Sequence, residues 1–134
     1  MDPDADTPAG LVVVDAANVI GARPDGWWKD RAGAAERLID QLAAAHRVPE
    51  LTGRRVVVVL EGRGVDASTE GHDVAVVRAP RDGDATIVDV VREHQDDDVL
   101  VVTSDRELRR RVEALGARTV GAGWLRDLLD APAE

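Results

Sequence analysis

Short runs of apolar, β-branched residues alternate along the chain with segments in which apolar residues recur every three or four positions. Runs that are apolar on both faces are typical of strands buried in a parallel sheet. Four such runs are present, at 11–15, 55–61, 73–79 and 98–104, and a weaker one at 117–120 predicts a fifth strand.

The segments between these runs have the spacing of helices with one apolar face. The clearest extends from Ala35 to Leu42, where apolar residues fall at i, i+3, i+4 and i+7. Similar patterns predict helices around 87–91 and 108–115 and a closing helix at 123–130. Residues 62–72 are barely long enough for a crossover, so we expect a loop or one short helix there.

This alternation of strands and helices predicts an α/β fold. The expected architecture is a three-layer sandwich with a mainly parallel sheet of about five strands, right-handed crossovers and a Rossmann-like topology. One domain is expected over residues 11–130. Residues 1–10 are acidic and contain proline, which predicts a disordered lead-in, and 131–134 form a short tail.

Composition narrows the class of protein. Apolar residues make up 44% of the sequence, but its only aromatic residues are Trp27, Trp28 and Trp124, so the core must be built from Val, Leu, Ile and Ala. The absence of cysteine excludes disulfides and thiolate metal sites. No secretory pattern and no apolar run near the roughly 20 residues that cross a bilayer are present, so we expect a cytoplasmic protein without a membrane partner.

The charge balance limits the ways in which the chain could bind nucleic acid. Acidic residues outnumber basic ones by 26 to 17, which gives a formal net charge of −9. Affinity for phosphate backbones comes largely from Lys and Arg, so this balance argues against a general electrostatic binder. Any nucleic-acid role therefore requires a local basic rim or metal ions.

Acidic side chains follow the predicted strands at the points where those strands end. In an open parallel sheet, ligands bind outside the carboxyl ends of the strands. Three separate loops each bring an aspartate to this edge, where like charges repel unless they share a cation. Oxygen ligands without cysteine favour Mg²⁺ or Mn²⁺ over Zn²⁺. The polar residues at the ends of the first four predicted strands are Asp15 and Asn18, Glu61, Asp82 and Asp84, and Asp105.

Helix capping is the alternative explanation for these aspartates. Aspartate is among the best N-cap residues, and both Asp84 and Asp105 lie at the start of predicted helices. Ser104 and Glu107 have the spacing of a capping box, which would leave Asp105 on the first turn and free of capping. Asp15 is expected to cap no helix.

Three segments in order resemble the motifs of the NYN domain, a branch of the PIN-like ribonuclease superfamily that includes YacP-like bacterial members. They read VVVDAANVIG, GDATIVDVV and VVTSDREL, and they span most of residues 11–125. The resemblance implies a PIN-like fold and a Mg²⁺- or Mn²⁺-dependent ribonuclease that hydrolyses single-stranded or flexible RNA. It also implies catalytic roles for Asp15, Asn18, Asp84 and Asp105, in which the three aspartates bind metal and Asn18 orients the metal shell or a phosphate.

The sequence departs from this pattern at one position. Many relatives have a second acid directly after the mid-chain aspartate, where this chain has Ala85. Glu61, Asp82 or Asp89 could supply the additional carboxylate. A water activated by metal needs no side-chain nucleophile, which agrees with the lack of cysteine.

Basic and aromatic residues in the loops around this edge could bind RNA, and the alternative is scattered solvated charge. A basic collar around the acids would be formed by Arg23, Lys29, Arg31, Arg63, Arg78 or Arg81, and Arg106. Trp27 and Trp28 follow a turn-forming segment and could stack on bases, or pack on the end of the next helix. At least two of the three arginines at 109–111 are expected to point to solvent. We expect them to form a solvated helix face, and the alternative is a nucleic-acid patch.

Two rival functions follow from the same residues. Ala85 motivates a non-catalytic RNA-binding or adaptor domain of the same fold. The segments LEGRG and SDRE suggest a Toprim-like or phosphatase-like metal enzyme, which leaves Asp15 and Asn18 unexplained. A phosphate-binding loop ending in GK[ST] is absent, so no nucleotide cofactor is expected. The sequence indicates no oligomeric state.

Overall fold

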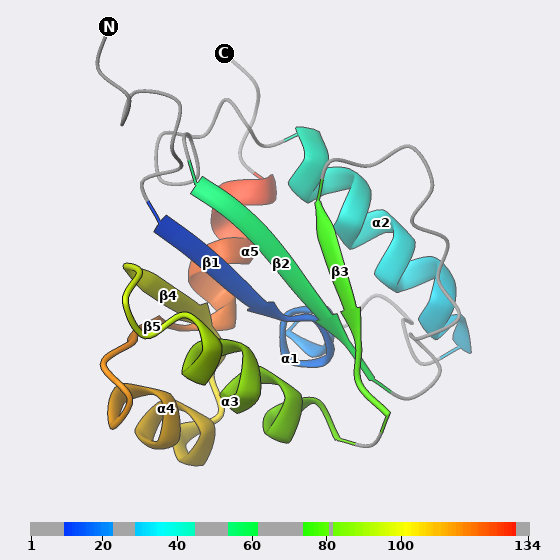
Figure 1. Cartoon of the computed structure of the whole chain (residues 1–134). Coiled ribbons are helices and arrows are strands. Elements are labelled where there is room, and N and C mark those ends of the chain that lie inside the picture. Colours follow the sequence, from blue (N-terminus) through cyan, green and yellow to red (C-terminus); the bar gives the residue numbers. More distant parts are fainter. Residues whose placement is uncertain (1–9, 23–28, 45–53, 62–73, 81, 131–134) are drawn as a thin grey trace, which may run out of the picture.

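A computed structural model describes residues 10–22, 29–44, 54–61, 74–80 and 82–130 of the chain (Figure 1). Its five strands form one sheet in the order β3-β2-β1-β4-β5, and all four neighbouring pairs are parallel. The strands are β1 (Gly10–Asp15), β2 (Arg54–Leu60), β3 (Ala75–Arg78), β4 (Val99–Val102) and β5 (Arg118–Val120). The predicted α/β fold with a parallel sheet is confirmed.

Helices cover both faces of the sheet, as Figure 1 shows. They are α1 (Ala16–Gly21), α2 (Arg31–Ala44), α3 (Gly83–Glu93), α4 (Arg106–Glu113) and α5 (Ala122–Asp130). The four helices expected from apolar spacing are present. Helix α1 was not predicted, because its six residues are too few to show a helical repeat.

The central strand explains how two cores form in one domain. Successive side chains of a strand point to opposite faces of the sheet. Val12 and Val14 pack with α1, α2 and α5, whereas Leu11 and Val13 pack with α3 and α4. Because β1 is buried on both faces, it has an uninterrupted apolar sequence, and the three predicted layers are present.

The order of the strands locates the region where a ligand would bind. The chain passes from β1 to β2 and β3 on one side, and β4 and β5 lie on the other side. The order therefore reverses between β1 and β4, which is the topological switch point of the sheet. A ligand would therefore bind there, outside the carboxyl ends of β1 and β4.

Some expectations fall on residues that the structure does not describe. Gly10 is the first residue of β1, and the rest of the expected lead-in, the tail at 131–134 and the link at 62–72 lie outside the described residues. None of the described helices has both the length and the apolar character that a membrane span requires.

Candidate active site

A cavity of about 320 Å³ lies at the carboxyl edge of the sheet. We call it the acidic pit. It is lined by Asp15, Ala17, Asn18, Glu61, Asp82, Asp84 and Asp105. The structure thus brings together all four residues for which catalytic roles were predicted and two of the three additional acids.

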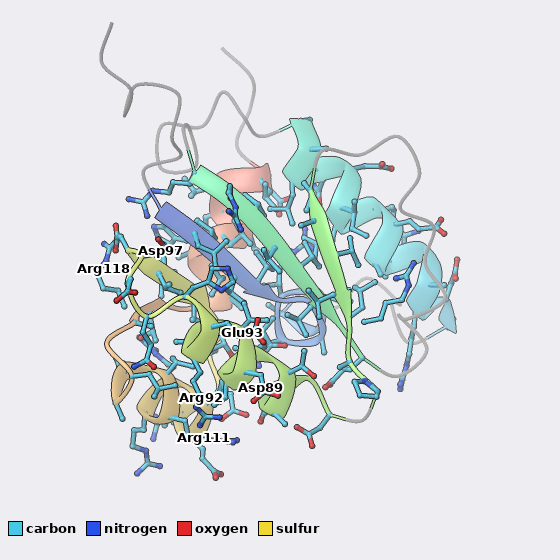
Figure 2. All side chains as sticks on the ribbon, viewed as in Figure 1. Asp89, Arg92, Glu93, Asp97, Arg111 and Arg118 are labelled. Atoms are coloured by element: carbon cyan, nitrogen blue, oxygen red, sulfur yellow. The ribbon has the colours of Figure 1, made fainter. Side chains whose placement is uncertain are left out.

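The third additional acid, Asp89, is not part of this lining. It lies on the exposed side of α3, where its carboxylate forms an ion pair of 3.5 Å with Arg92. Figure 2 labels both residues on α3. Of the acids considered as replacements at the Ala85 position, Glu61 and Asp82 are therefore the ones placed to act in the pit.

Asp15 is the buried acid of the pit, with only 7% of its surface exposed. It ends β1, and its Oδ1 accepts a hydrogen bond of 3.3 Å from the backbone N–H of Asn18. Asp15 is thus the N-cap of α1, and the expectation that it caps no helix was wrong. Its other oxygen, Oδ2, accepts a hydrogen bond of 2.9 Å from the hydroxyl of Thr103.

Thr103 connects two of the acidic loops and was not singled out from the sequence. Its fully buried hydroxyl donates to Asp15 and accepts a hydrogen bond of 3.1 Å from the N–H of Asp105. It therefore positions a carboxylate that follows β1 from a loop that follows β4. The signal available in the sequence was its place immediately before Ser104 and Asp105 in the third motif.

Asn18 and Ser104 form a second connection across the switch point. The Oδ1 of Asn18 accepts a hydrogen bond of 2.8 Å from the N–H of Ser104. The hydroxyl of Ser104 accepts one of 2.9 Å from the N–H of Ala122, at the start of α5. Since Oδ1 holds the loop in place, the Nδ2 amide of Asn18 is the part of this side chain that can donate to a ligand.

Two other pit aspartates begin helices. The Oδ1 of Asp105 accepts from the N–H groups of Glu107 and Leu108, at 2.9 and 3.1 Å, so Asp105 is the N-cap of α4. The expected capping box with Ser104 as the cap was wrong. Asp82, not Asp84, caps α3 by accepting from the N–H of Ala85 at 2.9 Å.

Glu61 reaches the pit from the end of β2. Its Oε2 accepts a hydrogen bond from the N–H of Gly83, the first residue of α3. A Cβ atom at Gly83 would lie 2.7 Å from this oxygen, so only glycine allows the approach without displacing the carboxylate. The glycine before Asp84 thus helps to bring α3 and β2 together at the pit.

Burial, and after it the neighbouring carboxylates, disfavour the charged forms of Asp15 and Asp84. Burial raises the pKa of Asp15 from 3.8 to about 6, the hydrogen bonds from Thr103 and Asn18 oppose this shift, and the charges of Asp84 and Glu61 add to it. The pKa of Asp84 is also raised, first by burial and then by Asp105, Glu61 and Asp82, while Arg111 opposes the shift. The pit is therefore a region of strong negative potential.

Helix geometry explains how the fold tolerates these charges. Helices α1, α3 and α4 all begin at the pit, and their N-terminal N–H groups carry partial positive charge. These groups hydrogen-bond carboxylates at three of the pit positions. Asp15 and Asp105 each cap a helix through Oδ1 and also line the pit. The same carboxylate can therefore serve as a helix cap and as part of the pit.

The oxygen atoms that line the pit suit a hard divalent cation. The charged donors that the described residues bring to the pit are all carboxylate oxygens, which suit Mg²⁺ and Mn²⁺. Within the part of the chain that the structure describes, no three acidic or histidine side chains are gathered at the spacing of a closed ligand set.

The predicted basic collar is only partly within the described residues. Lys29 lies just before α2 and Arg106 is the first residue of α4, and both are exposed. Neither lines the acidic pit. The predictions for Arg23, Trp27, Trp28, Arg63 and Arg81 fall outside the described residues.

We expect Thr103→Val to weaken both the fold and the pit. Valine has a similar shape but no hydroxyl, so the Asp15 carboxylate and the Asp105 N–H each lose a partner. The free energy of unfolding should fall by about 1–3 kcal/mol, as measured by denaturant titration. The rise in melting temperature on addition of Mn²⁺ should also be smaller, because Asp15 is no longer held in position.

Thr119→Val is the matched control for this substitution. The Thr119 hydroxyl is also hydrogen-bonded, to Arg109 and Glu113 on α4, and it lies outside the pit lining. Its replacement should leave the Mn²⁺-dependent rise unchanged. A wild-type response to Mn²⁺ in Thr103→Val would show that Thr103 does not position a metal-binding carboxylate.

The parallel sheet in the order β3-β2-β1-β4-β5 places the chain among Rossmann-like α/β domains, and its pit lies at the switch point, where ligands of such sheets bind. The chain matches the YacP-like NYN domain family over residues 12–133 and belongs to it, which makes it a member of a nuclease family. The resemblance seen in the sequence is confirmed.

Two solved structures have similar folds. Rae1 (YacP) from Bacillus subtilis is 26% identical and superimposes with a TM-score of 0.71 over 88% of this chain and 72% of that one. A tryptophan-to-leucine mutant of the same protein is 23% identical, with a TM-score of 0.69 over 89% and 74% of the two chains. No match was found among curated proteins.

Proposed function

We propose that this domain is a Mg²⁺- or Mn²⁺-dependent ribonuclease that hydrolyses phosphodiester bonds of single-stranded or flexible RNA. The observation that carries the proposal is the meeting of Asp15, Asp84 and Asp105, from the end of β1 and the starts of α3 and α4, in one pit at the switch point. Membership of a nuclease family supports the reaction class. The preference for RNA rests on the resemblance to PIN-like ribonucleases.

The three aspartates would hold the cation, with Glu61 and Asp82 as further carboxylates. When bound, such an ion supplies an acidified water for attack and neutralises the charge that develops on the leaving oxygen. Among the described residues, the pit lining contains no serine, cysteine or histidine that could act as a nucleophile, so the proposed nucleophile is water. The Nδ2 amide of Asn18 would donate to a phosphate oxygen and orient the scissile group.

The fold restricts how these residues move. Asp15 is held at both oxygens, and Asp105 is held by two backbone N–H groups of α4. Carboxylates that are fixed before the substrate binds lose little freedom on metal binding, which favours a site of defined geometry. Asp84 has no such bond to its carboxylate among the described residues and is the most adjustable of the three.

Cleavage of end-labelled single-stranded RNA, with and without Mn²⁺, tests the proposal. We expect products only when the metal is present, and far fewer with single-stranded DNA of the same sequence. Asp127→Asn is a matched control, because Asp127 is an exposed acid on α5 outside the pit, and it should cleave like the wild type. Cleavage in the presence of a chelator would contradict the metal mechanism.

A non-catalytic RNA-binding domain is the second candidate function. It was motivated by Ala85, which is exposed in the first turn of α3 and carries no carboxylate. The presence of Glu61 and Asp82 in the pit lining weakens this argument, because either can supply the further acid. RNA binding without cleavage across Mg²⁺, Mn²⁺ and several RNAs would favour the binding domain.

A further inference from the structure

Helix α4 is rich in arginine within a chain of net charge −9. It carries Arg106 and the three arginines at 109–111. The prediction that at least two of these three face solvent is confirmed, because Arg110 and Arg111 are exposed. The guanidinium groups of Arg106, Arg110 and Arg111 make no hydrogen bond or ion pair with described residues, so their charges are available to a ligand.

The rotation of α4 about its axis determines where each arginine points. Leu108 and Val112 are fully buried and face the core. The Nε of Arg109 donates to the Thr119 hydroxyl of β5 at 3.0 Å, so Arg109 lies on the flank of the helix next to β5. Successive helical residues are roughly 100° apart, which puts Arg111 about 200° from Arg109. Arg111 is therefore on the opposite flank.

That opposite flank faces α3. Helix α4 packs against both β5 and α3, and α3 carries Asp84 in its first turn at the pit. The charge of Arg111 lowers the pKa of Asp84, so its field reaches the pit. Figure 2 shows Arg111 on the same side of the molecule as Arg92 of α3. The seam between α3 and α4 thus leads away from the pit and has an unpaired arginine on it.

We propose that Arg111 binds a phosphate of the RNA strand where the strand leaves the acidic pit along the seam between α3 and α4. The inference rests on the proposed ribonuclease function and adds the path of the substrate to it. An anionic strand that enters a negative pit needs positive contacts beside it. Arginine suits this role, because its planar guanidinium donates two parallel hydrogen bonds to a phosphate and stays charged.

A metal cation and an RNA phosphate carry opposite charges, so the loss of Arg111 should change the binding of the two in opposite directions. The positive charge of Arg111 repels a cation held at Asp84, so its removal should leave Mn²⁺ binding as tight or tighter. The same removal should weaken RNA binding. Because Arg111 is exposed and unpaired among the described residues, neutral replacements should preserve the fold.

The experiment compares Arg111→Gln with Arg110→Gln, on the same helix but one position away, in the full chain. Initial rates of single-stranded RNA cleavage are measured at saturating Mn²⁺ over a range of RNA concentrations. We expect Arg111→Gln to raise KM about tenfold with kcat nearly unchanged, the signature of a contact kept in ground and transition states. Arg110→Gln should change KM less than about twofold, and Arg111→Lys should recover part of the loss.

Salt dependence and thermal melts complete the test. In Arg111→Gln the slope of log affinity against log salt should become shallower by about 0.7, the value for one phosphate of a single strand. The Mn²⁺-dependent rise in melting temperature should be retained. Equal kinetics for the glutamine variants of Arg110 and Arg111, or loss of the Mn²⁺ response in the latter, would overturn this inference alone. Absence of cleavage by the wild type would overturn the proposed function and this inference with it.

Discussion

Asp15→Asn, Asp84→Asn and Asp105→Asn should each lower ribonuclease activity more than 100-fold without lowering the stability of the metal-free protein. Loss of a metal ligand should exceed the 10- to 100-fold losses typical of residues that only support a ligand. Asparagine caps a helix nearly as well as aspartate, so α1 and α4 keep their N-caps. What each variant loses is one negative charge among several that repel. In Asp15→Asn the Thr103 hydroxyl must also reverse its bond and accept from the asparagine Nδ2, because an amide nitrogen cannot accept a hydrogen bond.

Thermal melts with a chelator and with Mn²⁺ separate the metal role from the capping role. A ligand that binds only the folded state stabilises it by about 2.7 kcal/mol at 100 times its Kd, so the wild type should melt higher in Mn²⁺. With chelator, the three variants should melt at or above the wild-type temperature. In Mn²⁺ they should gain less than the wild type, whereas Asp127→Asn should gain as much.

These melts can also contradict the assignment. A wild-type protein whose melting temperature does not respond to Mg²⁺ or Mn²⁺ would show that the carboxylates share no ion. A variant that keeps the full rise in melting temperature would show that the substituted aspartate does not bind the ion. In either case the catalytic assignment would be wrong, and helix capping would be the main role of Asp15 and Asp105.

The second large effect that we expect is a dependence of stability on pH that originates at Asp15. Burial raises the pKa of its carboxyl group from 3.8 to about 6, against the hydrogen bonds from Thr103 and Asn18. Between these two values the folded state binds more protons than the unfolded state, so stability falls as the pH rises. Above about pH 6 the full penalty applies, and a shift of this size corresponds to about 3 kcal/mol.

Asp15→Asn should remove this penalty. In chelator, its free energy of unfolding should exceed that of the wild type by up to about 3 kcal/mol near pH 7.5, and the difference should disappear near pH 4. Urea titrations of both proteins at the two pH values measure it. Taking the difference between proteins cancels the titration of groups that the substitution does not affect.

The same urea titrations on a variant of a surface aspartate provide the control. Asp127→Asn, on the exposed side of α5, should differ from the wild type by the same amount at both pH values. If the difference between wild type and Asp15→Asn were likewise independent of pH, Asp15 would not titrate with a raised pKa, and the electrostatic account of the pit would fail.

The sequence alone determined the fold class and the approximate position of every strand. A strand buried on both faces leaves an uninterrupted apolar run. The four apolar runs and the weaker segment at 117–120 all correspond to strands of the sheet within a few residues. The same reasoning brought Asp15, Asn18, Asp84 and Asp105 to one edge, since the carboxyl ends of parallel strands share an edge. Those conclusions need only local patterns and the direction of the chain.

The tertiary structure decided which of these side chains cooperate, and how. The N-cap is the residue whose backbone is extended where a helix begins, so Asp82 and not Asp84 caps α3, and Asp105 and not Ser104 caps α4. The place of β4 beside β1 brings Thr103 to Asp15 across 88 residues of chain. Spacing along the sequence does not contain these relations, because they depend on strand order and on the rotation of each helix against the sheet.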